Sequence, residues 1–143
     1  MARTFALRIA NDTMPSHMFD VDAPVGEGAA NNRADVLLVQ YLLAIWMASS
    51  KDPAERAIIM KAPVVVVDGI CGKNTIGAIR AFEEANPRVI KDGRVHPFNT
   101  PMSSIAKILV LNMKLFFAGG LRGPVPKLAI EFPQELIPLL FRP

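Results

Sequence analysis

Apolar side chains recur at helical spacing in four stretches of the chain, and each stretch predicts an α-helix. The first stretch is apolar on both of its faces, which is typical of a helix buried on more than one side. In two others proline stands in the expected first turn, where its missing N–H is not needed. We expect helices over 33–49, 53–60, 74–85 and 101–117, the last one capped by Thr100.

The remaining stretches favour extended backbone. Apolar and polar residues alternate weakly over 4–9, which permits a short strand, and 64–67 is a run of β-branched valines. The chain beyond residue 118 is apolar but interrupted by proline, so it cannot form one continuous helix. We therefore predict a mainly α protein with an extended N-terminal arm over 1–24, a compact helical domain over 25–118 and a Pro-rich apolar C-terminal arm over 119–143.

Two copies of one short pattern precede two of these helices. Asp68-Gly69 lies seven residues before Thr75, and Asp92-Gly93 lies eight residues before Thr100. Glycine after aspartate adopts positive φ in a turn at no steric cost. Threonine can then accept a hydrogen bond from a free N–H in the first helical turn. The pattern predicts positive φ at both glycines and helices that begin near residues 74 and 101.

The motifs and their order resemble the peptidoglycan-binding-domain-like family, small three-helix modules often attached to cell-wall hydrolases. They read Asp-Val-x-x-Val-Gln-x-Leu-Leu from Asp35, Asp-Gly-x-x-Gly-x-x-Thr from Asp68, Ala-Ile-x-x-Phe from Ala78, and a second Asp-Gly at Asp92. The match covers about residues 25–112. It departs from the family at Glu83, where glutamine is usual, and at an insertion over about 51–64.

The resemblance implies a compact three-helix core and a shallow groove between helices that holds peptidoglycan without catalysis. The stem peptide and the glycan both remain candidate ligands. Polar groups at helix starts and turns are the candidate ligand-binding residues, although side chains that cap helices have the same chemistry. These residues are Gln40, Asn74, Thr75, Arg94 and His96.

Composition and charge narrow the possible functions. An apolar content of 51% with 20% charged residues excludes a disordered chain. The net charge of +3 is small and dispersed, so we expect no nucleic-acid partner. The first residues lack the apolar run of a secretory signal peptide, and no apolar run is long enough to span a bilayer. We expect synthesis in the cytoplasm, with access to a cell wall through a lysed cell, a phage particle or an injection device.

Catalytic and metal-binding chemistry is poorly represented. The single Cys71 has no neighbouring base in the sequence, so it is expected to be structural. The adjacent acids Glu83 and Glu84 point in different directions on a helix. His17 lies near two aspartates, but a solvated arm explains that cluster better than a metal site. We therefore predict no catalytic residues, no metal and no cofactor.

A second function, of a different class, stays open. The chain can be a structural or adaptor protein of a phage tail or contractile injection system, in which the fold serves assembly. A free-standing wall binder has little need of a large apolar tail, whereas an assembly arm would use it to form homo- or hetero-oligomers. The candidate partner-binding residues are Phe132, Ile137, Leu139, Leu140 and Phe141.

Overall fold

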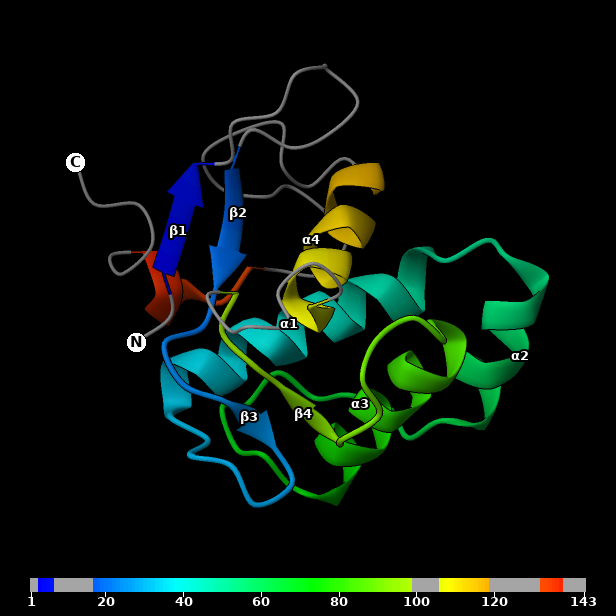
Figure 1. Ribbon diagram of the computed structural model, residues 1–143, viewed down its shortest axis with the longest axis horizontal. Coiled ribbons are helices and arrows are strands. Elements are labelled where there is room, and N and C mark those ends of the chain that lie inside the picture. The colour runs from blue at the N-terminus through cyan, green and yellow to red at the C-terminus, as the bar shows by residue number, and fades with distance from the viewer. Residues whose placement is uncertain (1–2, 7–16, 99–105, 119–131, 138–143) are drawn as a thin grey trace.

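A computed structural model describes residues 3–6, 17–98, 106–118 and 132–137, and the protein is mainly helical (Figure 1). Two short antiparallel strand pairs accompany the helices, β1 with β2 and β3 with β4. None of the described helices has the length and apolar character needed to cross a membrane. The elements are β1 (Arg3–Ala6), β2 (His17–Asp20), β3 (Val25–Gly26), α1 (Arg33–Ser49), α2 (Pro53–Lys61), α3 (Lys73–Ala85), β4 (Arg94–Val95), α4 (Lys107–Phe117) and a 3-10 turn, η2 (Gln134–Leu136).

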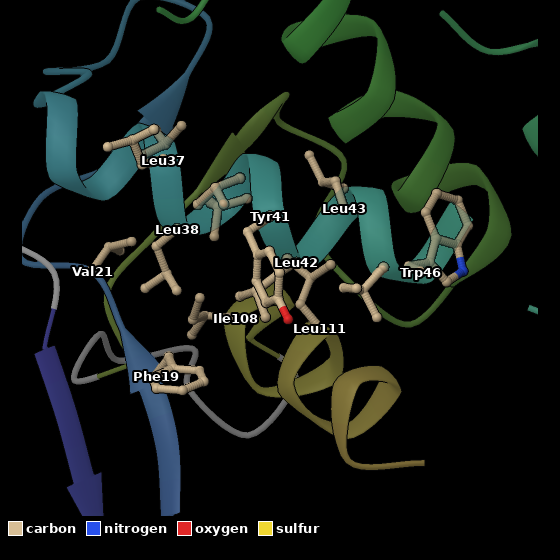
Figure 2. Close-up of a cluster of buried hydrophobic side chains, with 14 of the residues drawn as sticks. Phe19, Val21, Leu37, Leu38, Tyr41, Leu42, Leu43, Trp46, Ile108 and Leu111 are labelled. Atoms are coloured by element: carbon tan, nitrogen blue, oxygen red, sulfur yellow. The ribbon is translucent and has the colours of Figure 1, made fainter. Parts of the chain in front are cut away.

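Helix α1 forms the centre of the described part of the chain. Every residue over 35–43 is buried, as expected for a helix that is apolar on both faces. Figure 2 shows Leu38 and Tyr41 of α1 pointing toward Ile108 and Leu111 of α4. Further along α1, Trp46 is 1% exposed and contacts Phe82 of α3 edge-on, with 5.0 Å between ring centroids. The core therefore surrounds α1 rather than lying on one side of it.

Three of the four predicted helices have nearly the predicted bounds, and the fourth differs. Helix α4 begins at Lys107, because Ala106 before it is extended with φ −64° and ψ 133°. The predicted start at Pro101 is therefore wrong, and Thr100 and Pro101 themselves lie outside the described residues. The Lys107 side chain, at the first residue of α4, is held by a carboxylate of α3 and by one of the turn that follows α3.

Residues from both expected arms pack on the helical core. Phe19 at the end of β2 is 3% exposed, and Phe132 is also 3% exposed. The Phe132 ring lies 5.0 Å from the Tyr41 ring and 5.6 Å from the Phe19 ring. Phe132 and Ile137, which we expected at a partner, pack against the chain's own core, where Phe132 is buried and Ile137 is partly buried. A helix apolar on both faces needs cover on more than one side, and these segments supply it.

Of two further short segments, one forms a strand pair and the other does not. β3 pairs with β4, with Val25 opposite Val95, so the loop before α1 lies beside the second Asp-Gly turn. The valine run over 64–67 does not form a strand, although its side chains alternate between exposed and half-buried. No strand in the described part of the chain pairs with it, and Val64 and Val66 are 78% and 59% exposed. Leu139, Leu140 and Phe141 lie outside the described residues.

Candidate functional site

The two Asp-Gly turns have the same backbone geometry, as the sequence predicts. Gly69 has φ 78° and Gly93 has φ 72°. In each turn the aspartate Oδ1 accepts the N–H of the residue two positions on, at 2.9 Å for Ile70 and 3.0 Å for Arg94. The carboxylate therefore closes a tight turn in which the residue after the aspartate has positive φ. Glycine adopts this conformation without steric cost.

The buried side chain of Gln40 holds the first turn to the middle of α1. Its Oε1 accepts the N–H groups of Asp68 and Gly69, at 3.0 and 2.9 Å. Its Nε2 lies 3.0 Å from each of three acceptors, namely Asp68 Oδ1, the Ile70 carbonyl and Thr75 Oγ1. Gln40 is 0% exposed, so its carboxamide is committed to the turn and presents no surface to a ligand.

Thr75 differs from the expected helix cap. The N-cap of α3 is Gly72, and Thr75 stands inside the first turn of the helix. Its hydroxyl accepts a hydrogen bond from Gln40, and the residue is 4% exposed. The threonine thus links α3 to α1. Gln40 and Thr75 are buried and bind each other. Of the three expected ligand residues near the first turn, only Asn74 is exposed.

An ion pair holds the second turn in place of a single glutamine. Glu83 of α3 accepts the Gly93 N–H on Oε2, at 2.7 Å. Lys107 of α4 donates to Asp92 Oδ1 at 2.7 Å and to the Arg94 carbonyl at 2.8 Å. The Lys107 and Glu83 charges lie 2.9 Å apart, with side chains only 4% and 3% exposed. The acceptor and the donor that Gln40 combines are here divided between two helices.

The aspartates of both turns have lowered pKa values. Burial alone would raise the pKa of Asp92, but hydrogen bonds from Lys107 and His96 outweigh it and lower the value to about 2. The pKa of Asp68 is lowered by hydrogen bonds from the Ile70 N–H and from Gln40. Both carboxylates are therefore ionised at neutral pH and act as acceptors.

Arg94 and His96 lie at the second turn, apart from Asn74 at the first. The Arg94 Nε donates to the carbonyl of Glu27 at 2.6 Å, across the β3–β4 pair. The His96 Nε2 lies 2.8 Å from Asp92 Oδ2, and both side chains are about one-third exposed, at 37% and 34%. The structure therefore divides the five expected ligand residues between two turns. The side chains of Gln40 and His96 bind turn residues, Thr75 binds Gln40, Arg94 binds the β3 side of the strand pair, and Asn74 is exposed.

An open hollow lies beside the first turn, and we name it the first-turn hollow. Its volume is about 240 Å³. The rim combines the exposed polar side chains of Lys73 and Asn74 with exposed apolar ones, since Ile70 is 67% exposed. Sequence reasoning found Asn74 but missed Lys73. The lining residues are Val66, Asp68, Ile70, Gly72, Lys73, Asn74 and Thr75.

The structure places the side chains that the sequence offered for catalysis. Cys71 is half-buried, and burial raises the pKa of its thiol, which disfavours the reactive thiolate. Glu83 is buried and Glu84 is exposed, so these adjacent acids do not converge on one substrate. Among the described residues, no three His, Cys, Asp or Glu side chains gather in a metal-binding group.

No family model, no curated protein and no solved structure matches this chain. The resemblance to the peptidoglycan-binding-domain-like family therefore depends on the motifs around Gln40 and the two Asp-Gly turns alone. What the structure defines is a mainly helical protein in which two equivalent turns are held rigidly against the helices.

Proposed function

We propose that the protein is a non-catalytic module that binds peptidoglycan at the first-turn hollow. One observation carries the proposal: the turn beneath the hollow is held by the buried carboxamide of Gln40. The exposed side chains of Lys73 and Asn74 therefore project from a fixed backbone. A preformed site loses less conformational entropy on binding than a flexible one, so even a shallow hollow can bind usefully.

The chemistry of the hollow suits the wall's peptide component. A stem peptide offers carboxylates, backbone amides and small apolar side chains. Lys73 supplies a cation for a carboxylate, Asn74 supplies an amide donor and acceptor, and Ile70 supplies an exposed apolar edge. Among the described residues, the lining contains no aromatic side chain on which a sugar ring could stack. We therefore assign the peptide, rather than the glycan, to this hollow.

The placement of the helices supports the same proposal. The motifs that resemble the family fall on α1, on α3 and on the two turns, whereas α2 coincides with the predicted insertion. A core of α1, α3 and α4 is thus compatible with a three-helix module that carries one extra helix. Phe19 and Phe132, from the two expected arms, belong to the chain's own core, which weakens the argument for an assembly arm.

Sedimentation with purified cell-wall sacculi tests the proposal. The wild-type protein should co-sediment. The double substitution Lys73→Ala/Asn74→Ala should weaken binding by about tenfold, because it removes at least one charge-assisted hydrogen bond to the ligand. Lys91→Ala is the matched control, because it removes another exposed lysine that lies outside the hollow. A wild-type protein that stays in the supernatant contradicts the proposal. So does a double variant that binds as well as the control.

A second function keeps one specific observation in its favour. Met60, Val64, Val66 and Ile70 are 80%, 78%, 59% and 67% exposed, on and after α2. Exposed large apolar residues close together in the chain are typical of protein contact surfaces. We propose as the alternative an adaptor role in a phage or injection particle, through this surface. Mass measurement over a concentration series should then show oligomers that Met60→Ser/Val64→Ser abolishes, and a monomer at all concentrations would contradict self-assembly.

A further inference from the structure

A second hollow lies where α1 and α4 end and α2 begins, and we name it the helix-end hollow. Its volume is about 300 Å³, and it shares no lining residue with the first-turn hollow. In Figure 1 these helix ends lie at the upper right, away from β3 and β4. Its lining residues are Trp46, Ser49, Ser50, Lys51, Asp52, Glu55, Lys114, Phe117 and Ala118.

The hollow has an aromatic face that is free to contact a ligand. Phe117, in the last turn of α4, is 69% exposed. Its ring lies edge-on to that of Phe116, with 5.5 Å between centroids, which limits its orientation. Trp46 cannot play this part, because it is 1% exposed and its indole N–H donates to Glu55 Oε1 at 2.5 Å. The stacking surface of the hollow is therefore Phe117.

The charges around the hollow balance. The Lys114 Nζ lies 3.2 Å from Glu55 Oε2, and these side chains are 29% and 12% exposed. Lys51 and Asp52 are both exposed, and Asp52 Oδ1 accepts the Ala54 N–H at the start of α2. The two cations are thus matched by two carboxylates. A site with balanced charge favours a neutral ligand over a phosphate, a carboxylate or a cation.

We propose that the helix-end hollow binds a neutral saccharide. The apolar face of a sugar ring would stack on Phe117, as apolar groups do on exposed aromatic rings. The hydroxyl groups would pair with Ser50, Lys51 and Asp52, which supply both donors and acceptors at the rim. An aromatic platform beside a few polar groups is the usual composition of a small-ligand site. This inference does not rest on the first-turn hollow.

Calorimetric titration of the full chain with two neutral trisaccharides tests this proposal. The probes are chitotriose, built from N-acetylglucosamine, and maltotriose, with trigalacturonic acid as the anionic comparison. At least one neutral trisaccharide should bind, and Phe117→Ala should weaken it by about tenfold, whereas Phe117→Tyr keeps the aromatic face and the affinity. Met60→Ala is the control, because it removes another highly exposed apolar side chain outside the hollow.

Three results would overturn the proposal. The first is that neither neutral trisaccharide binds with a dissociation constant below about 10 mM. The second is unchanged affinity in the Phe117→Ala variant, and the third is tighter binding of the anionic trisaccharide. The variant Lys73→Ala/Asn74→Ala should retain trisaccharide binding, so a failure at the first-turn hollow is distinguished from a failure here.

Discussion

Gln40 and Lys107 play the same part at two different turns. The Gln40 Nε2 donates to Asp68 Oδ1 and to the carbonyl of Ile70, two residues further on. The Lys107 Nζ donates to Asp92 Oδ1 and to the carbonyl of Arg94, again two residues further on. The glycine N–H of each turn is also bound: Gln40 Oε1 accepts it at the first turn, and Glu83 Oε2 accepts it at the second.

The neutral carboxamide at the first turn and the ion pair at the second differ in the free-energy cost of burying them. A carboxamide is neutral, so its burial requires only that its hydrogen bonds are made. A buried lysine and a buried glutamate must both lose hydration, and they are stable only together. We therefore expect the second turn to respond to charge substitutions and to pH more strongly than the first.

Removal of the lysine alone should be strongly destabilising. Lys107→Met leaves Glu83 buried without its cation, and we expect the free energy of unfolding to fall by about 3 kcal/mol or more. Adding Glu83→Gln removes the stranded charge and supplies a carboxamide like that of Gln40. The double variant should recover at least half of the loss in urea unfolding. A double variant no more stable than Lys107→Met alone would contradict this role for the pair.

The glycine of the first turn should resist substitution. At Gly69 a Cβ atom would lie 2.6 Å from Arg33 Nη1. The backbone there also has φ 78°, a conformation in which residues other than glycine are strained. We expect Gly69→Ala to lower the free energy of unfolding by about 1 kcal/mol or more. Gly72→Ala is the matched control, since a Cβ there meets nothing within 4 Å. Equal losses from the two substitutions, measured by chemical denaturation, would refute the strain argument.

Asp92 should make the protein sensitive to acid. Its pKa in the folded protein is about 2, below the ordinary value of 3.8. The unfolded chain therefore binds more protons between these values, so stability is present above pH 3.8 and is lost as the pH falls toward 2. In urea unfolding at several pH values, Asp92→Asn should flatten this decline. The exposed control Glu84→Gln should leave the decline in place, and an unchanged slope in Asp92→Asn would contradict the assignment.

Phe132 should contribute to folding rather than to assembly. It is 3% exposed between Phe19 and Tyr41, so Phe132→Ala leaves a cavity and should cost about 3 kcal/mol of stability. Phe117→Ala provides the comparison, because that ring is 69% exposed and its loss should have little effect. Thermal unfolding measures both. A wild-type melting temperature in Phe132→Ala would mean that the ring does not belong to the core.

The turns and most helices were predictable because their causes are local. An Asp-Gly pair sets its own backbone, and apolar residues on both faces of 33–49 predict a helix that is buried on more than one side. The start of α4 and the role of Thr75 were not predictable in this way. Lys107 and Glu83 are 24 residues apart, and Gln40 and Thr75 are 35 apart, so no local pattern reveals that they meet.

The candidate site was predicted only in outline. Caps and ligand contacts use the same side chains, so the sequence could not separate Asn74, which is exposed, from Gln40, which is buried. The packing of Phe132 was missed for a related reason. An apolar segment broken by proline fits its own core as well as a partner's, and only the uncovered side of α1 decides between them.

Backbone amide NMR with soluble peptidoglycan fragments tests the central claim most directly. Fragments that contain the stem peptide should shift the amide signals of residues 68–75 in a saturable manner. These shifts should be lost in the Lys73→Ala/Asn74→Ala variant and retained in Lys91→Ala. Saturating fragments that leave the signals of 68–75 unchanged, or that shift them equally in both variants, would contradict peptidoglycan binding at the first-turn hollow.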